Sequence, residues 1–458
     1  MFSNIKKALS GLRGLVVAAI LALTLVPTAA LAAGYDNTGS LTVNNVKAGD
    51  VVNVYQVVTT HWNAATNDFG VDGFNPTYNI SLNFADYNKN GGFDATGLNA
   101  NAQTIASDVA KSGVAATKTA TVDRNATSVT FQGLPAGQYL VVVTSASAGE
   151  VYQNVIASVL PTTENGSYVM KDASVDIKKG SVDLQKTVGT VNDAAQITAE
   201  NVDTVSKGGI VYFKVTTTLP KYAEGAKDRV FHITDAMDKG LTVQGNATVT
   251  VDGKAVTDGV TVNGAEVKLS NDFLLANGGK SVVITYAAKL DDNLTAGTYK
   301  NTASLEYSTD SVSDSKQNLS DDAHVTVYKQ DFLKIKKGDA NTTLAGAEFD
   351  VYKADGTKLS DHIVTDKNGK AFVDGYGAGS YYLVETKAPT GYKIPDGTTH
   401  FDFTVANGSM TVNVPNEPAD LGGSLPTTGG AGTIGLTAAG VAIMAGAAAL
   451  LVRSRKQN

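Results

Sequence analysis

Polar residues interrupt several apolar strand rows of this 458-residue chain, among them a glutamate in the segment YYLVETKAPTGY, residues 381–392. Alternate residues of an extended strand share one face, so Glu385 lies in the same row as Tyr381 and Leu383. A charged carboxylate in a buried row is unfavourable unless it is paired. Either the register is different or the Glu385 carboxyl has a chemical role.

The same kind of interruption recurs in a fixed order. Three apolar rows between residues 182 and 305 each contain one polar residue: Lys186, Asp235 and Asn301. After residue 330, the corresponding rows contain Lys337, Glu385 and Asn416. Lys336 remains open as the alternative to its neighbour Lys337, although strand parity favours Lys337. Both segments thus present a lysine, then an acid, then an asparagine.

Such a triplet can form a covalent bond. Burial lowers the pKa of a lysine and raises that of a carboxyl group, so a buried pair can exist as a neutral amine and a neutral acid. A neutral amine held against a carboxamide carbon can attack it, while the acid polarises the carbonyl and carries protons to the departing ammonia. The product would be a Lys–Asn isopeptide bond, formed once, which is self-modification rather than turnover.

A purely structural interpretation competes with this chemistry. Long lysine side chains often extend along a sheet into solvent, and asparagines are common where strands end. One triplet alone would leave the two interpretations about even. Two triplets in the same order favour crosslinking.

Composition indicates an all-β protein outside the cell. Val, Thr and turn dipeptides are frequent and helical periodicity is scarce between residues 34 and 420. The net charge of −7 with mixed signs argues against nucleic acid as a partner. The chain has no cysteine, which excludes disulfides, a thiol nucleophile and a zinc–thiolate site. An exported protein of this kind needs another source of stability.

Both ends of the chain resemble targeting segments. Residues 1–32 combine early lysines, an apolar run at 15–26 and an Ala-Leu-Ala site, as in a secretory signal peptide. Residues 431–452 form an uncharged apolar run long enough to span a bilayer, followed by a basic tail. We therefore expect export, followed by a transient membrane intermediate.

The segment before that run is a recognisable processing site: Leu425, Pro426, Thr427, Thr428 and Gly429. Together with the apolar span and the basic tail, it resembles the cell-wall sorting signal of Gram-positive bacteria. The resemblance implies that a sortase cleaves between Thr428 and Gly429 and transfers the Thr428 carbonyl to an amine. Pro426 favours an extended peptide and Gly429 permits close approach, which suits such a substrate.

Composition shifts divide the mature chain into three expected β-domains. The predicted ranges are 33–177, 178–330 and 331–420, followed by a linker and sorting region at 421–458. Their alternating runs and glycine turns favour antiparallel, immunoglobulin-like β-sandwiches in tandem.

The segment 381–392 resembles the E-box of Gram-positive pilins and of collagen-adhesin B-type domains. LAGAEFDVYKADG and TDKNGKAFVDG resemble the first half of such a domain, and HITDAMDKGL and YKNTASLEY resemble the middle domain of sortase-assembled major pilins. The resemblance implies two bonded pairs, Lys186–Asn301 and Lys337–Asn416, with Asp235 and Glu385 as their acids.

The same resemblance implies how subunits join. In this family a lysine at the end of the first domain receives the threonine of the next subunit. ASVDIKKGSVDLQK occupies that place, with Lys179 as the best match and Lys178 as the alternative. The family's Tyr-Pro pair is missing, so the acceptor is open between the two lysines, and a solvated linker pair is the competing interpretation.

We therefore expect the shaft subunit of a cell-wall-anchored pilus that supports adhesion. Expected partners are copies of itself, pilin-specific and housekeeping sortases, minor pilins, peptidoglycan and a host or extracellular-matrix ligand. The alternatives are a singly anchored adhesin and a minor basal pilin.

We expect neither enzymatic activity nor a cofactor, because no nucleophile–base or paired-carboxylate motif occurs. No metal site is expected either. Asp86–Asp94 resembles the start of a calcium loop, but Gly97 stands where a bidentate glutamate is needed.

Overall fold

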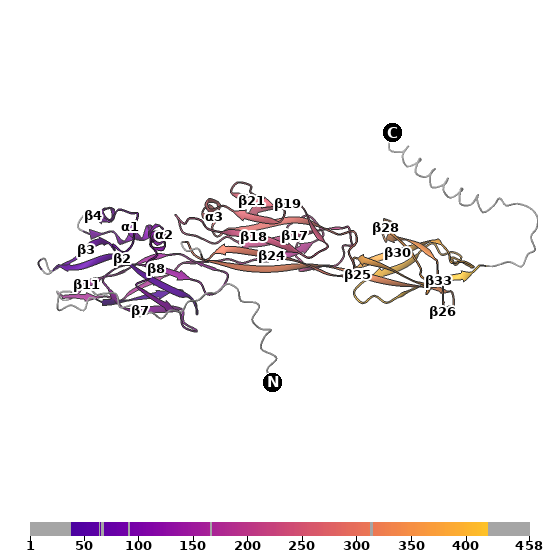
Figure 1. The fold of residues 1–458 in the computed structure, drawn as a ribbon, viewed down its shortest axis with the longest axis horizontal. Coiled ribbons are helices and arrows are strands. Elements are labelled where there is room, and N and C mark those ends of the chain that lie inside the picture. Colours follow the sequence, from indigo (N-terminus) through magenta and orange to yellow (C-terminus); the bar gives the residue numbers. More distant parts are fainter. Residues whose placement is uncertain are drawn as a thin grey trace, which may run out of the picture.

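The structure is a computed structural model that describes residues 38–419, with gaps at 64, 66–67, 90–91, 165–166 and 312–314. The described chain is an elongated rod of β-sheets that follow one another in sequence order (Figure 1). Buried apolar side chains form successive clusters along it, at 41–177, 151–327 and 332–414. The predicted all-β fold is confirmed.

The first part of the rod contains two main sheets that pack around Val, Leu and Tyr side chains. One sheet has the order β13 (Ala173–Asp176), β1 (Thr38–Asn44), β7 (Ser128–Pro135). The other has the order β10 (Val155–Val159), β8 (Gly137–Thr144), β2 (Val51–Asn63), β3 (Asp68–Phe74), with β6 (Lys118–Thr121) also paired to β2.

Short elements decorate this first part. Two two-stranded ribbons are formed by β4 (Asn88–Lys89) with β5 (Gly92–Phe93) and by β11 (Pro161–Glu164) with β12 (Ser167–Met170). The 3-10 turn η1 (Phe84–Asp86) and the helices α1 (Ala95–Ala100) and α2 (Ala102–Ser112) cover the second sheet with Leu98, Ile105 and Val109. Asp94 caps α1, since its Oδ1 accepts the amide of Gly97 at 2.7 Å.

The middle part is a sandwich of a five-stranded sheet against part of a ten-stranded one. The five-stranded order is β15 (Gln185–Gly189), β17 (Ile210–Thr218), β23 (Ser281–Leu290), β19 (Leu241–Val251), β20 (Lys254–Ala255). The facing strands are β21 (Val260–Asn263), β22 (Glu266–Leu269), β18 (Phe231–Met237), β24 (Gly297–Ser308) and β25 (Lys316–Lys336). The helix α3 (Asn271–Asn277) and the strand β16 (Asn201–Val202), which pairs with β25, complete this part.

Strand β25 runs from the middle sandwich into the last one. Its 21 residues pair with β24 first and then with β29 (Lys370–Tyr376), β33 (Val412–Pro418) and β26 (Asp339–Thr343), and β31 (Tyr392–Lys393) pairs with β33. The opposing sheet has the order β28 (Lys358–Val364), β27 (Glu348–Lys353), β30 (Gly379–Lys387), β32 (Phe401–Val405). The predicted division after residue 330 therefore falls inside a continuous strand.

The sheets are mixed, whereas the sequence predicted antiparallel pairing throughout. Parallel pairs join β1 to β13, β16 to β25 and β25 to β33. In the β25–β33 pair, Lys334 is opposite Val414 and Lys336 is opposite Asn416. The first and last strands of the final sandwich thus lie side by side, and this brings the predicted lysine and asparagine strands together.

Candidate functional site

Two buried lysine–acid–asparagine clusters

In the last sandwich, three polar side chains meet in a closed triangle. Lys334 on β25 donates from Nζ to Glu385 Oε2 on β30 at 2.8 Å and to Asn416 Oδ1 on β33 at 2.7 Å. Asn416 Nδ2 donates to Glu385 Oε1 at 2.8 Å. The side chains of Lys334 and Glu385 are fully buried. Phe349 and Phe401 lie over the amine, with ring centroids 5.0 and 5.1 Å from Nζ.

The sequence predicted Lys337 as the lysine of this cluster, and that prediction is wrong. Lys337 follows the end of β25, is exposed and pairs with Glu417. Lys336 is half-buried, and within the described part of the chain its side chain forms no hydrogen bond or ion pair with Glu385 or Asn416. Glu385 and Asn416 lie where the sequence placed them, in the buried rows of their strands.

The error has a physical cause. The sequence prediction followed Leu333 and Ile335, but within the last sandwich the inward row of β25 is Gln330, Phe332 and Lys334. Two of these three residues are polar, so hydrophobicity marks this face poorly. The sequence held no signal that separates the two lysines, because Phe332 precedes Lys334 by two residues just as Ile335 precedes Lys337.

In the middle sandwich, the predicted residues also lie close together, but a fourth residue lies among them. Lys186 on β15 contacts Asp235 on β18, with 2.5 Å between Nζ and Oδ2. Tyr286 on β23 donates to the same Oδ2 at 2.5 Å and accepts from Asn301 Nδ2 on β24 at 3.1 Å. Lys186 Nζ also contacts the Tyr286 hydroxyl. Sequence reasoning missed Tyr286, which occupies the buried row of its strand.

Both lysines are electrostatically suited to be nucleophiles. Burial lowers the pKa of Lys186 and of Lys334 below the usual 10.5, while their acids act in the opposite direction. Burial also raises the pKa of Tyr286 well above 10, so its hydroxyl stays protonated. A lowered lysine pKa favours the neutral amine, which is the form that attacks a carboxamide.

The lysines between the first two sandwiches

Lys179 is held by neighbouring side chains, whereas Lys178 is exposed. Lys179 begins β14 (Lys179–Ser181), which pairs with β9 (Glu150–Tyr152). Its Nζ lies 3.6 Å from Glu150 Oε1 and 5.6 Å from the centre of the Tyr152 ring. Lys178 lines a hollow of about 200 Å³ together with Gln153, Asn154 and Glu224.

Predictions outside these clusters

The sorting residues Leu425, Pro426, Thr427, Thr428 and Gly429 lie outside the described residues, as do the signal peptide and the apolar span at 431–452. Within residues 38–419 and outside the gaps, no helix is long and apolar enough to cross a membrane. In the same part of the chain, no group of three or more His, Asp or Glu side chains is arranged to hold a metal ion.

Comparison with known proteins

Two family models match the C-terminal part of the chain. Residues 331–418 match a prealbumin-like fold domain, and residues 421–458 match the LPXTG cell wall anchor motif. The second match contains the predicted sorting residues. The chain is therefore a cell-wall-anchored surface protein.

Among curated proteins, the trypsin-resistant surface T6 protein of Streptococcus pyogenes is 24% identical over 445 residues, covering 87% of this chain and 77% of that protein. The fimbrial subunit type 2 of Actinomyces naeslundii is 25% identical over 410 residues, covering 72% of each chain.

Among solved structures, the T6 backbone pilin of Streptococcus pyogenes superposes with a TM-score of 0.61 at 22% identity, covering 82% of this chain and 81% of that one. The major pilin SpaD of Corynebacterium diphtheriae gives a TM-score of 0.53 at 18% identity, covering 84% and 98%. This chain thus combines the fold of Gram-positive major pilins with an LPXTG anchor, as in the sortase-assembled pilins that its sequence resembles.

Proposed function

We propose that this chain is the shaft subunit of a covalent cell-surface pilus, stabilised by two internal isopeptide bonds. The observation that carries the proposal is the closed triangle of Lys334, Glu385 and Asn416. A buried ion pair is a weak source of stability, because desolvation offsets its attraction. Two such clusters in one exported chain without cysteine are better explained as reactants than as structural pairs.

The proposed bonds are Lys334–Asn416 and Lys186–Asn301. In each, the lysine Nζ attacks the asparagine Cγ, the Cγ–Nδ2 bond breaks, and one proton moves from Nζ to the departing nitrogen, which leaves as ammonia. Glu385 and Asp235 are the proposed acid–base groups. Each bond would join strands that lie far apart in the sequence.

We further propose that a sortase joins Thr428 of one subunit to Lys179 of the next, with Lys178 as the alternative. The contacts of Lys179 with Glu150 and the Tyr152 ring support it, because they hold the amine in one place. A pilin-specific sortase would polymerise the chain, and a housekeeping sortase would attach it to peptidoglycan. Minor pilins and a host or matrix ligand complete the proposed partners.

We propose three domains, at 33–177, 178–330 and 331–420, with the second division inside β25. Each would carry its own β-sandwich core.

The crosslinks are tested by the intact mass of the recombinant chain and by peptide mapping. We expect the wild-type chain to lack two ammonia molecules, and the K334A and K186A variants to lack one each. K337A is the matched control and should still lack two. A wild-type mass equal to that of the unmodified sequence would refute both bonds.

Polymerisation is tested by immunoblotting wall extracts of the producing strain after boiling in detergent. We expect a ladder of covalent multimers that K179R removes and K178R leaves unchanged. The reverse result would assign the acceptor to Lys178. A single anchored species in the wild type would instead favour a singly anchored adhesin or a basal subunit.

A further inference from the structure

The two clusters differ in how the acid reaches the asparagine. In the last sandwich, Glu385 contacts both reactants directly, through Oε2 to Lys334 Nζ and Oε1 to Asn416 Nδ2. In the middle sandwich, Asp235 contacts Lys186 Nζ at 2.5 Å, but Asn301 Nδ2 donates to the Tyr286 hydroxyl instead. The same hydroxyl donates to Asp235 Oδ2 at 2.5 Å.

The difference follows from side-chain length. Aspartate is one methylene shorter than glutamate, so one carboxylate is less able to span a lysine on one sheet and an asparagine on another strand. Tyr286 projects from the five-stranded sheet that also carries Lys186, whereas Asp235 and Asn301 lie on adjacent strands of the facing sheet. The phenol is therefore placed between the acid and the leaving nitrogen.

We propose that Tyr286 is a catalytic residue of the middle-domain crosslink, acting as a proton relay from Asp235 to Asn301 Nδ2. This inference rests on the proposed isopeptide function. Asp235 and Tyr286 together would do what Glu385 does alone in the last domain. The hydroxyl touches both reacting nitrogens and is mostly shielded from water, since the tyrosine is 5% exposed.

The step balances without an external reagent. Starting from a neutral Lys186 amine and a protonated Asp235, Nζ forms a bond to Asn301 Cγ. The Cγ–Nδ2 bond then breaks with its electron pair on Nδ2. Tyr286 gives its proton to Nδ2 and regains one from Asp235, which takes one from Nζ. The products are an amide N–H, ammonia and a protonated Asp235.

Unpaired oxygens support this assignment. Asp235 Oδ1 and Asn301 Oδ1 are both buried and have no hydrogen-bond partner, whereas both Glu385 oxygens and Asn416 Oδ1 are paired. Buried polar atoms without partners are costly, and a catalytic role is one reason that a protein keeps them. The middle cluster therefore leaves more of its polar atoms without partners, and among the described residues the Tyr286 hydroxyl is the hydrogen-bonded link from Asp235 to the Asn301 amide.

The test follows ammonia loss over time in freshly purified full-length Y286F, with each crosslink located by peptide mapping. We expect the Lys186–Asn301 bond to form at least about tenfold more slowly, because proton transfer by a positioned group contributes roughly 10²–10⁴-fold. The Lys334–Asn416 bond in the same molecules is the internal control and should form at the wild-type rate.

A rescue variant separates a proton relay from a structural role. In Y286F/D235E, the longer acid should reach the asparagine amide and restore formation of the middle bond, whereas repacking around a lost hydroxyl would not be repaired by a longer acid. Wild-type kinetics in Y286F would overturn the inference, as would failure of D235E to accelerate Y286F. Absence of both bonds in the wild-type chain would instead refute the isopeptide proposal itself.

Discussion

At the scale of single residues, chemistry depends on whether a charge is buried with its partner or left at the surface. Lys334 and Lys337 are three positions apart, yet the first is enclosed by Glu385, Asn416 and two phenyl rings, while the second lies in water beside Glu417. Burial, rather than residue type, distinguishes the proposed nucleophile from an ordinary surface lysine.

These two lysines should respond differently to truncation. We expect K334A to lower the free energy of unfolding of the last domain by at least about 2 kcal/mol, because Glu385 and Asn416 each lose a buried partner at a cost of about 1–3 kcal/mol. K337A removes only an exposed pair and should cost about 0–1 kcal/mol. Denaturant unfolding, read by hydrogen exchange in β30 and β33, measures both. Equal losses would contradict the assignment of Lys334.

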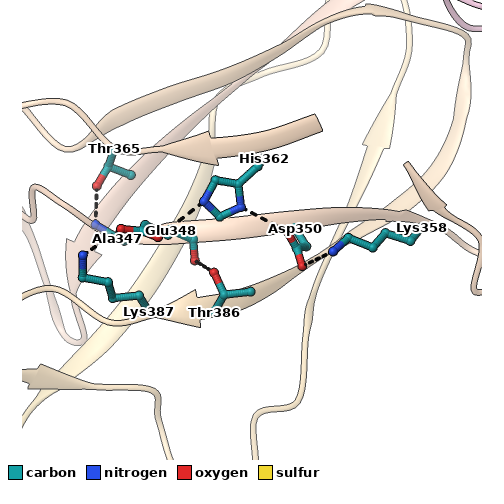
Figure 2. A network of polar contacts seen from close by, with 8 residues as sticks. All are labelled: Ala347, Glu348, Asp350, Lys358, His362, Thr365, Thr386 and Lys387. Atoms are coloured by element: carbon teal, nitrogen blue, oxygen red, sulfur yellow. Dashed lines mark hydrogen bonds and ion pairs between the residues drawn. The ribbon is translucent and has the colours of Figure 1, made fainter. Parts of the chain in front are cut away.

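In contrast to the buried clusters, a network of exposed ion pairs around His362 should make stability depend on pH. Figure 2 shows His362 between Glu348 and Asp350, with Lys387 and Lys358 at the two ends. The hydrogen bond to Asp350, with a smaller contribution from Glu348, raises the pKa of His362 above 6.5. Hydrogen bonds from Lys387 and Lys358 lower the pKa values of Glu348 and Asp350, respectively.

The directions of these three pKa shifts define the pH range in which the network stabilises the fold. The contribution of His362 to the stability of the folded state is complete below its ordinary pKa of 6.5 and is lost as pH rises through the raised pKa. The contributions of the two carboxylates are complete above their ordinary values of 4.5 and 3.8 and are lost as pH falls through the lowered ones. The network should therefore stabilise the folded state most strongly between about pH 4.5 and 6.5.

NMR titration of His362 checks this. D350N should lower the pKa of His362, because it removes the larger of the two stabilising charges. D402N, on β32 at the opposite edge of the same sheet and outside this network, is the control and should leave the titration of His362 unchanged. An unaltered pKa in D350N would exclude Asp350 as the cause.

At the scale of elements, the continuous strand β25 and the irregularity of β29 at Gly375 couple the last two sandwiches. Gly375 lies at the irregularity in the pairing of β29 with β25, with φ +76°, and its carbonyl accepts the amide of Lys207 at 2.7 Å. A Cβ there would lie 2.0 Å from the carbonyl oxygen of Leu294. Glycine is thus required both by conformation and by the close approach of the two domains.

Substitution at two glycines separates these requirements. Gly356 also has positive φ, at +89°, but a Cβ there meets nothing within 4 Å. G356A should cost only the left-handed strain of about 1–2 kcal/mol, whereas G375A should cost about 1–3 kcal/mol more through overpacking. Equilibrium unfolding measures stability, and small-angle scattering should show a less extended rod for G375A alone. Equal effects of both variants would argue against a close contact at Gly375.

At the scale of the whole molecule, the two proposed crosslinks would brace the rod against tension. In the proposed pilus, force would enter at the acceptor lysine and leave through Thr428. The Lys334–Asn416 bond would join neighbouring first and last strands of one sheet, and Lys186–Asn301 would join the two sheets of the middle sandwich. Covalent bonds at these places would keep the enclosed segments from extending.

Single-molecule stretching of the full chain tests this. Lys334 and Asn416 are 82 positions apart, which at about 3.4 Å per residue corresponds to about 280 Å of hidden length. We expect an unfolding step of about this size in K334A and none in the wild type or in K337A. A step of this length in the wild-type chain would show that the bond does not carry the force.

The sequence by itself determined the all-β class, the buried acids and asparagines, and the sorting motif, because each depends on local period or on contiguous residues. Lys186, Asp235 and Asn301 could be predicted as one set because each continues a row of alternating apolar residues in its own segment. In the structure, Lys186 contacts Asp235, and Tyr286 lies between Asp235 and Asn301, while the bond between Lys186 and Asn301 stays a prediction.

Only the tertiary structure decided which lysine completes the second cluster, because Gln330 and Lys334 are two of the three inward residues of β25 in the last sandwich, and which residues face inward depends on pairing with β29 and β33. The same holds for Tyr286. A tyrosine in an apolar row has no local mark of function, and its position between Asp235 and Asn301 arises only when two sheets from distant parts of the chain pack face to face.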